Sequence, residues 1–443
     1  MKKNRLWRPV VAVASLAAAA AALSGCSGFG ASTGNAGSKV TITFLVQNDQ
    51  ATTTRAKQLI AGFEKKNPDI TVKLDTQPAG TQGDNLMKTK LSTKTMDNVF
   101  YYNSGSLFQA LNPKTSMVDL SDESWVKDLD KNFKQVVSVD GKVYGAPLGT
   151  SFAGGILYNK AIYNKLGLSI PTTWDEFIAN SKKIAASDPG VTPILQSYGD
   201  TWTSQLLVLG DFANINKQDP NWADNYTNNK GDAKYVNEPA FEGFQHTADI
   251  HTSGLVNKDF ASMTNAQAMD ALATGKAAQY PMLTASIATV QQDNADKVND
   301  IGVFAIPATT AADTSLTLWE PNGVYIASTT TGDKLAAAKK FVAFLNSPDG
   351  CEIQNTTGAV AGPYVDSVCK APSDAPALVA DIQKYIDDDK ASPALEFLSP
   401  IKGPNLETIL IGVGSGTTSP QVGAQQYDQD VKAQAQQLGI KGW

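Results

Sequence analysis

Arginine and histidine are scarce in this 443-residue chain, which has two histidines and, beyond residue 8, a single arginine, Arg55. Carboxylate and phosphate ligands are commonly held by the bidentate guanidinium group of arginine. The scarcity of arginine therefore favours an uncharged ligand. A Ser-His-Asp triad would have to use His246 or His251, and the G-x-S-x-G nucleophile motif is missing. These two histidines are spaced i, i+5 on a polar helical segment, which predicts exposed side chains and no zinc pair.

Clustered basic residues are also lacking. Four of the 37 Lys and Arg residues lie in the first 25 positions, and the rest of the chain carries 33 basic against 43 acidic residues, a formal charge of −10. Nucleic acids and anionic lipid headgroups are bound by clustered Lys and Arg. The sequence therefore predicts no nucleic-acid partner and no electrostatic contact with a membrane.

Motifs for catalysis or cofactor binding are incomplete. Ser124–Lys127 fits S-x-x-K, but S-D-N and K-T-G are absent, and Gly412–Gly416 lacks the third glycine of G-x-G-x-x-G and a P-loop lysine. We interpret Gly412–Gly416 as a helix end and the acidic run Asp387–Asp389 as a solvated helix terminus. The sequence thus predicts no catalytic residue, no cofactor and no metal site. A secreted carbohydrate-active hydrolase stays open, because a glycosidase needs only two suitably spaced carboxylates.

The N-terminal segment has the layout of a signal peptide. Residues 1–8 are basic, and the apolar stretch Pro9–Leu23 is shorter than the roughly 20 residues that cross a bilayer. Leu23-Ser24-Gly25-Cys26 resembles the bacterial lipoprotein signal, in which the cysteine is diacylated. We expect residues 1–25 to be a lipoprotein signal peptide, Cys26 to anchor the protein to the extracellular face of the cytoplasmic membrane, and the Gly- and Ser-rich residues 26–38 to be a flexible tether. Ordinary secretion with a stray cysteine is the alternative.

If Cys26 is lipidated, Cys351 and Cys369 remain as a pair with 17 residues between them. An extracellular compartment is oxidising, which favours a structural disulfide between these two residues. Such a bridge stabilises by about 3 kcal/mol through the entropy of loop closure.

Hydrophobic periodicity predicts an α/β fold. Alternating apolar residues over Val40–Val46 and Ile70–Leu74 indicate strands, and the apolar spacing over 56–63 indicates a helix that Pro68 stops. This βαβ unit should have parallel strands and a right-handed crossover. A short strand is expected at 98–102, and amphipathic helices at 174–186, after a Thr173/Glu176 capping box, and at 335–345.

Ligands of open parallel sheets gather beyond the carboxyl ends of the strands. Asp49 and Gln50 follow the first strand, and Tyr102, Asn103 and Ser104 follow the strand at 98–102. These residues are therefore expected at the rim of a site, although Asn, Asp and Ser are also common in plain turns and caps.

Several motifs occur in a fixed order from about Val40 to the C-terminus. They are Val143–Leu148 (VYGAPL), Gly155–Lys160 (GILYNK), Pro171–Phe177 (PTTWDEF), Thr274–Ala278, Trp319–Ala327 and Phe341–Pro348. Together they resemble the family 1 extracellular solute-binding proteins of ABC importers, the group similar to maltose-binding protein.

The resemblance implies an α/β, two-lobed periplasmic-binding-protein fold of type II, with discontinuous lobes, a hinge and a ligand cleft between the lobes. We expect an N-terminal lobe of 39–147 with 305–362 and a C-terminal lobe of 148–304 with 363–443. The hinge should lie near Pro147–Thr150, Pro307 and Gly362–Pro363. The resemblance also implies a monomer that captures a neutral mono- or oligosaccharide, delivers it to the transmembrane permease subunits and performs no catalysis. A receptor for another neutral or metal-bearing solute is the runner-up.

The positions that bind ligand in this family can be carried over to this sequence. Trp319 is the first candidate for stacking on a sugar ring, with core packing at a strand start as its alternative. The family's usual Trp and Asn after residue 278 are replaced by Ala285 and Met282, which puts one stacking platform in doubt. The candidate ligand-binding residues are Asp49, Gln50, Tyr102, Asn103, Ser104, Tyr198, Trp202, Thr284, Trp319, Glu320 and Asn322.

Overall fold

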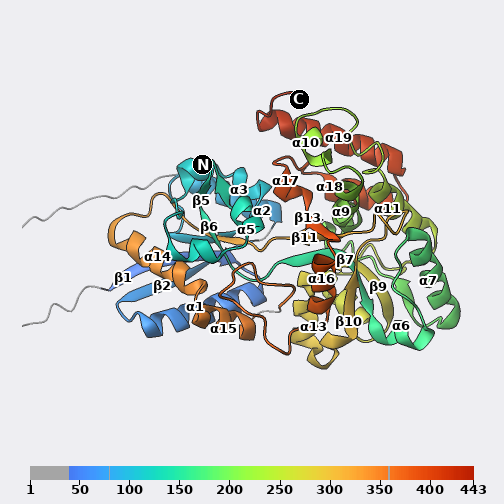
Figure 1. Ribbon diagram of the computed structural model, residues 1–443, viewed down its shortest axis with the longest axis horizontal. Helices are drawn as coiled ribbons and strands as arrows, with labels where there is room; N and C mark the ends of the chain where they lie inside the picture. Colours follow the sequence, from blue (N-terminus) through green and yellow to red (C-terminus); the bar gives the residue numbers. More distant parts are fainter. Residues whose placement is uncertain (1–38, 79, 358–359) are drawn as a thin grey trace, which may run out of the picture. The chain divides into compact units, whose positions relative to one another are not determined.

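The computed structural model describes residues 39–78, 80–357 and 360–443 (Figure 1). The expected signal peptide, the tether and the lipidation site Cys26 lie outside these residues. Within the described part of the chain, no helix has the length and apolar character needed to cross a bilayer.

The first sheet begins with the predicted βαβ unit. β1 (Val40–Gln47) pairs in parallel with β2 (Ile70–Gln77) and with β3 (Val99–Tyr102), and α1 (Gln50–Lys66) connects β1 to β2. The helix buries the predicted apolar face, from Ala56 to Phe63. β12 (Gly323–Ile326) runs antiparallel to β3, and β6 (Gly145–Pro147) runs antiparallel to β12, which completes the order β2-β1-β3-β12-β6. The parallel βαβ unit is therefore confirmed.

Helices from distant parts of the sequence cover this sheet. Phe341, on α14 (Gly332–Leu345), contacts the rings of Phe44 and Phe63 at centroid distances of 5.2 and 5.1 Å, which confirms the apolar face predicted for 335–345. The helices of the first lobe are α1, α2 (Gly80–Ser92), α3 (Ser106–Gln109), α4 (Pro113–Ser116), η1 (Ser124–Asp128), α5 (Lys131–Val136), α14 (Gly332–Leu345) and α15 (Pro348–Thr357), and β4 (Ser138–Val139) pairs with β5 (Lys142–Val143).

The second sheet is mixed and is built around β7 (Phe152–Asn159), which is buried except at Phe152. Its order is β13 (Ala391–Pro393), β11 (Leu316–Trp319), β7, β9 (Ala277–Leu283) and β8 (Thr192–Ile194), with β10 (Ile301–Phe304) also on β7. A Cβ at Gly155 would lie 2.4 Å from the Phe304 carbonyl oxygen. Only glycine therefore lets β7 and β10 approach this closely.

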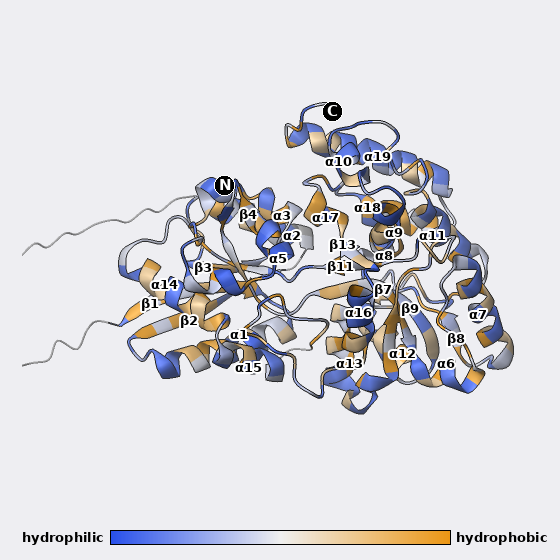
Figure 2. Cartoon of the chain, in the orientation of Figure 1, coloured by the Kyte–Doolittle hydropathy of each residue, from blue (hydrophilic) through white to orange (hydrophobic). Residues whose placement is uncertain are grey.

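Helices surround the second sheet, and Figure 2 shows blue, hydrophilic helix faces around predominantly orange strands. The Thr173/Glu176 capping box predicted at the start of α7 is present. The helices are α6 (Lys160–Leu166), α7 (Trp174–Ser187), η2 (Thr201–Gln205), α8 (Leu206–Gly210), α9 (Phe212–Gln218), α10 (Trp222–Thr227), α11 (Glu242–Thr252), α12 (Asn265–Ala273), η3 (Thr284–Ser286), α13 (Ile287–Asp293), η4 (Ala295–Asp300), α16 (Leu378–Asp387), α17 (Leu395–Leu398), α18 (Leu406–Gly414) and α19 (Pro420–Gln437).

The expectation that His246 is exposed is wrong. The residue is 4% exposed, and its ring stacks on Trp174 at a centroid distance of 3.7 Å. His246 shares the buried face of α11 with Gly243, Thr247 and Ile250, at spacings of i, i+3, i+4 and i+7. Because few of the residues on this buried face are apolar, hydrophobic periodicity in the sequence does not reveal it. Burial lowers the pKa of His246 to about 3, so the ring is neutral near pH 7.

The strand pairing corrects two of the expected lobe boundaries. β11 pairs with β7, so the chain returns to the first lobe near Glu320–Asn322 and not at residue 305. Ile306 is fully buried in the second lobe, so Pro307 lies inside that lobe and not at a hinge. Residues after 363 still contact the first lobe, where Asp130 N–H donates to the Val365 carbonyl oxygen at 2.7 Å.

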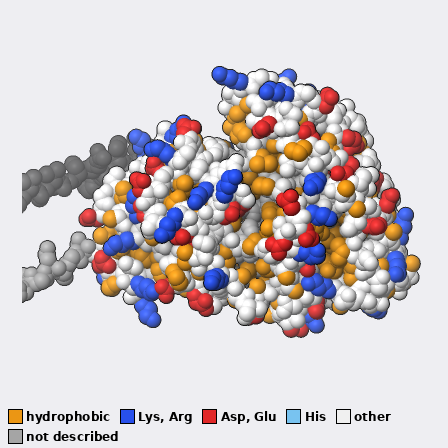
Figure 3. Space-filling view, viewed as in Figure 1, with side chains coloured by type: hydrophobic (Ala, Val, Ile, Leu, Met, Phe, Trp, Pro, Cys, Tyr) orange, Lys and Arg blue, Asp and Glu red, His pale blue; other side chains and the backbone are white. Residues whose placement is uncertain are grey.

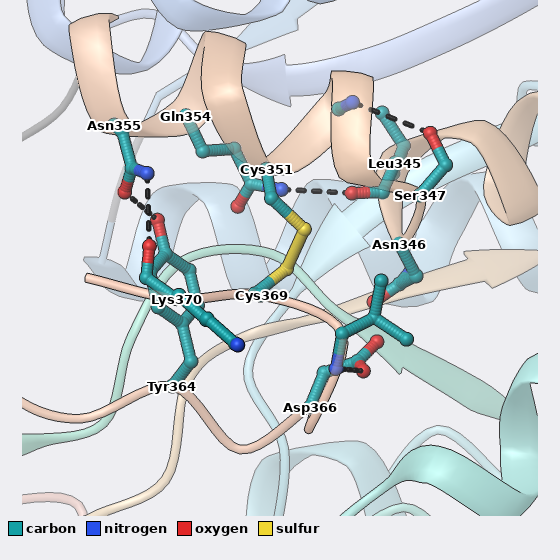
Figure 4. Close-up of a disulfide and its surroundings, with 12 residues drawn as sticks. Leu345, Asn346, Ser347, Cys351, Gln354, Asn355, Tyr364, Asp366, Cys369 and Lys370 are labelled. Atoms are coloured by element: carbon teal, nitrogen blue, oxygen red, sulfur yellow. Dashed lines mark hydrogen bonds between the residues drawn. A yellow bond between two sulfur atoms is a disulfide. The ribbon is translucent and has the colours of Figure 1, made fainter. Parts of the chain in front are cut away.

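A disulfide joins Cys351 on α15 to Cys369, with a Cα–Cα distance of 5.3 Å (Figure 4). Hydrogen bonds reinforce the same junction. Asn355 Nδ2 donates to the Lys370 carbonyl oxygen at 2.9 Å, and the Tyr364 hydroxyl donates to Asn355 Oδ1 at 2.8 Å. The bridge therefore holds the segment around 364–370 on the first lobe, before the chain enters α16 of the second.

Candidate functional site

A cavity of about 280 Å³ lies where the chain crosses between the two sheets. α1 and β3 line it from the first lobe, the start of β7 and the η3–α13 region line it from the second, and residues of three crossing segments complete the lining. The lining residues are Ala51, Thr52, Arg55, Tyr101, Leu148, Gly149, Thr150, Phe152, Ala285, Ala288, Pro321, Asn322, Thr357 and Ala361.

Comparison with the neighbouring cavities shows which one is the candidate ligand site. A cavity of about 320 Å³ adjoins the first, because both share Ala51, Ala288 and Thr357, and it adds Gln50 from the start of α1. A larger cavity of about 370 Å³ is lined only by first-lobe residues between Lys88 and Thr329. Only a site between the sheets can couple ligand to the relative position of the lobes, so the cavity at the crossings is the candidate.

Two aromatic side chains face this cavity, Tyr101 from β3 and Phe152 from β7. Trp319 on β11 is the cross-strand neighbour of Phe152, and the two rings lie nearly parallel, with a centroid distance of 6.3 Å and an interplanar angle of 9°. Trp319 covers Gly154, where a Cβ would lie 2.4 Å from the indole. The indole therefore packs beside the ring of Phe152 and does not line the cavity. Flat aromatic faces of this kind suit the C–H surfaces of sugar rings.

Hydrogen bonds fix the polar groups of the cavity. Asn322 Nδ2 donates to the Tyr101 hydroxyl at 3.0 Å, and the Asn322 carbonyl oxygen accepts from Leu148 N–H at 3.1 Å. Thr150 Oγ1 accepts from Ala361 N–H at 3.2 Å. These bonds tie the crossing segments together and leave the protons of the Tyr101 and Thr150 hydroxyls to donate. The arrangement can therefore bind the hydroxyl groups of a ligand.

Arg55 is the charged side chain in the cavity lining. Its guanidinium carbon lies 5.8 Å from the centroid of the Tyr101 ring, a cation–π contact. Gly149, with φ at +107°, passes beside it, and a Cβ there would lie 3.3 Å from a guanidinium nitrogen. The side chain is therefore held between β3 and the first crossing.

Three of the predicted residues lie at or next to the cavities. Asn322 lines the candidate cavity, and Gln50 lines the adjoining one. Asp49 caps α1, where its carboxylate accepts from Thr52 N–H at 2.8 Å. The structure therefore shows Asp49 in its capping role, the alternative that the sequence left open.

The residues predicted after β3 make internal contacts. The Tyr102 hydroxyl donates to Asp84 at 2.8 Å, and burial together with that carboxylate raises the pKa of Tyr102. The Asn103 carbonyl oxygen accepts from the Tyr325 hydroxyl at 2.9 Å, and the Ser104 hydroxyl donates to the Pro321 carbonyl oxygen, also at 2.9 Å. Tyr101, one residue earlier on the strand, is the side chain that reaches the cavity.

The second-lobe candidates are packed into that lobe. Thr284 is fully buried, and its hydroxyl donates to Ala361 and accepts from Ala153 N–H. Tyr198 is buried edge-to-face on Phe260 at 5.5 Å. Trp202 is half-buried against the second-lobe core. None of these three side chains lines the candidate cavity.

Glu320, on the crossing from β11 to β12, is 7% exposed, and its Oε2 has no hydrogen-bond partner among the described residues. Desolvation, and to a smaller extent the nearby Asp130, raise the pKa of Glu320 to about 8. Its carboxyl group is therefore largely protonated at neutral pH. Glu320 does not line the candidate cavity.

Prediction from the sequence missed four residues of the cavity lining, Arg55, Tyr101, Thr150 and Phe152. Two signals could have found Arg55 and Tyr101. Arg55 follows Ala51 and Thr52 on the first turns of the helix that leaves β1, and it is the only arginine beyond residue 8. Tyr101 precedes Tyr102 on a strand whose successive side chains alternate between the two faces of the sheet. Only one of the two tyrosines can therefore face the site, and Tyr101 was the untested choice.

Two lobes, each with its own sheet, joined by three crossings with a cavity between them, define a two-lobed ligand-binding protein. Comparison with known protein families identifies the family to which the chain belongs. Residues 50–350 match the bacterial extracellular solute-binding proteins, and the chain belongs to this family. The resemblance found in the sequence motifs is thereby confirmed.

Two curated relatives carry sugar-binding names. The multiple sugar-binding protein of Streptococcus mutans is 28% identical over 275 residues, which cover 61% of this chain and 62% of that protein. The melibiose/raffinose/stachyose-binding protein MelE of Bacillus subtilis is 25% identical over 338 residues, 74% of each chain.

Solved structures share the fold. The solute-binding protein RafE in complex with raffinose has a TM-score of 0.73 at 23% identity and covers 90% of this chain and 99% of its own. A sugar transporter protein of Bacillus licheniformis in complex with stachyose has a TM-score of 0.72 at 20% identity, covering 89% and 100%. The predicted α/β, two-lobed type II fold is confirmed.

Proposed function

We propose that this chain is the substrate-binding component of an ABC importer and that it captures a sugar, most suitably an oligosaccharide, in the cavity at the crossings. The observation that carries the proposal is the pairing of the aromatic ring of Phe152 with the hydroxyl donors of Tyr101 and Thr150 in a cavity between the lobes. The sugar-binding names of the relatives support the same ligand class.

Lobe closure is the proposed mechanism. Arg55 and Tyr101 belong to the first lobe, and Phe152 and Ala288 belong to the second. A sugar that touches both sets is bound more tightly when the lobes close, so it shifts the open–closed equilibrium. The closed form is then the form that delivers sugar to the permease subunits. No bond of the sugar is broken in this cycle.

The remaining expectations belong to the same proposal. A signal peptide would direct the chain outward, and diacylation of Cys26 would hold a monomeric receptor at the membrane through the tether of residues 26–38. The expectation of a neutral ligand rested on the scarcity of arginine, but Arg55 lines the cavity.

A thermal-shift screen of the body from Ser38 onward tests the proposal, with mono- and oligosaccharides as ligands and amino acids, peptides and metal chelates as controls. A ligand at 100 times its dissociation constant stabilises by about 2.7 kcal/mol. Tyr101→Ala and Phe152→Ala should abolish the shift, whereas Ile170→Ala, a change at an exposed apolar residue, should leave it.

Two outcomes would contradict the proposal. A response to a control class but to no sugar would remove sugar as the ligand. Recovery of shortened oligosaccharide after incubation would favour a hydrolase, whereas a receptor returns the sugar intact.

A further inference from the structure

Arg55 stands apart from the other cations of this protein. Every ion pair found in the described part of the chain has lysine as its cation, for example Lys90 with Asp97 at 2.9 Å and Lys339 with Glu123 at 2.7 Å. On the face shown in Figure 3, Lys and Arg side chains are likewise interspersed with Asp and Glu. Arg55 has no carboxylate oxygen within 4.0 Å among the described residues.

The guanidinium group also donates no hydrogen bond to another described residue, although it carries five N–H donors. It is half-buried in the cavity. The Tyr101 ring beneath it supplies a cation–π contact, which fixes its position but fills none of its donors.

A fixed, half-buried guanidinium with free donors is suited to a carboxylate, because two parallel N–H···O bonds match the two carboxylate oxygens. The acidic balance of the whole chain gives no long-range attraction for anions. Selection of an anion would therefore have to come from contact within the cavity. The rest of the lining suits a sugar, with Phe152 for the ring and Tyr101 and Thr150 for hydroxyls.

We propose that the sugar bound in this cavity carries a carboxylate, as a hexuronate does, and that Arg55 binds that group. This inference rests on the proposed function, because it names the class of sugar for the same site. It also reverses the argument made from the amino-acid count. A low number of arginines favours a neutral ligand only if none of them reaches the site.

The experiment compares matched pairs of ligands by titration calorimetry: glucuronate with glucose, galacturonate with galactose, and digalacturonate with a neutral disaccharide. The wild-type body should bind the acidic member at least about tenfold more tightly, since charge-assisted hydrogen bonds are roughly twice as strong as neutral ones. Arg55→Gln should remove this preference, because it should weaken binding of the acidic member of each pair much more than binding of the neutral member. Lys57→Gln, the same loss of charge at an exposed position on the same helix, should change neither.

A structural role for Arg55 predicts a different pattern. In that case Arg55→Gln weakens the binding of acidic and neutral sugars equally and lowers the melting temperature of the unliganded protein. Arg55→Lys has the same two effects. This pattern would overturn the inference. If Arg55→Gln fails to fold, Arg55→Lys decides the question. It should keep part of the acid preference, because it retains the charge but loses the bidentate fork.

The ligand panel separates this inference from the proposed function. Equal affinity for acidic and neutral sugars overturns the inference and leaves the sugar receptor in place. Preference for glucose 6-phosphate over glucuronate overturns the carboxylate assignment. A failure of all sugars, with a response to amino acids or peptides, overturns the proposed function itself.

Discussion

The two lobes differ in how they are built and in what they bring to the cavity. In the described part of the chain, the buried apolar residues of the first lobe form one cluster, whereas those of the second form three. The sheets themselves are alike, because each has one strand that runs opposite to the others, β12 in the first and β7 in the second. The first lobe supplies Arg55, Tyr101 and Thr52 to the cavity, and the second supplies the apolar Phe152, Ala285 and Ala288. Polar recognition and the apolar wall are thus divided between the lobes.

The largest expected effect tests the difference between the cores. Phe341→Ala should lower the free energy of unfolding by about 3–5 kcal/mol, because Phe341 is fully buried against Phe44 and Phe63. Since the first lobe has one cluster, hydrogen exchange should accelerate throughout that lobe. Phe177→Ala, at an equally buried ring in one second-lobe cluster, should accelerate exchange mainly around α7 and β10. If the acceleration of hydrogen exchange extended through the whole lobe in both variants, the proposed difference between the two cores would be contradicted.

Loss of the disulfide should have the next largest effect. Replacing Cys351 and Cys369 together by serine should lower the free energy of unfolding by about 3 kcal/mol. Because the bridge holds the segment around 364–370 on the first lobe, exchange should increase there and in α15. The wild-type protein under reducing conditions is the matched control and should behave like the double variant. Unchanged protection of residues 364–370 would show that the hydrogen bonds of this segment hold it on the first lobe without the disulfide.

Glu320, at a crossing between the lobes, should make stability depend on pH. Its folded pKa, about 8, is above the ordinary value of 4.5, so the folded state binds more protons between these values. Stability should therefore be full below pH 4.5 and decrease as pH rises towards 8, with a slope of at most about 1.4 kcal/mol per unit. Glu320→Gln should remove this component in denaturant titrations at several pH values. If Glu320→Gln leaves the pH dependence of the unfolding free energy unchanged, that dependence arises from other titratable groups.

The smallest effect concerns Asp49. As the cap of α1, its replacement by alanine should cost about 1 kcal/mol, and Asp49→Ser should restore most of this, because serine also caps. Thr173→Ala, which removes a second-lobe cap, should cost a similar amount and leave sugar binding unchanged. If Asp49→Ser restores stability but not sugar affinity, the carboxylate binds ligand as the sequence suggested.

Prediction from the sequence worked best where neighbours in sequence are neighbours in space. β1, α1 and β2 pack on one another, so their periodicity revealed both their type and their parallel pairing. β11 instead pairs with β7, which lies far earlier in the chain. No local pattern signals that partner, and the crossing was therefore expected at residue 305 when it lies near Glu320–Asn322.

The same limit applies to the site. Tyr101 and Tyr102 are adjacent on β3, and the sequence does not show which face of the strand meets the cavity. Trp319 is of the residue type that stacks on sugar rings, but the absence of a side chain at Gly154 lets the indole pack over β7, beside Phe152. The half-buried ring of Phe152 lines the cavity instead.

The sequence by itself determined the family, the α/β class, the acidic balance, the capping box of α7 and the early βαβ unit, because each depends on residue order or on local periodicity. The tertiary structure alone decided where the lobes exchange chain segments and which side chains meet in the cavity. Arg55 and Phe152 belong to different lobes and approach one another only when β1, β3, β7 and the crossings are in place. The contacts of the site are long-range, and their geometry is fixed by packing that no short segment contains.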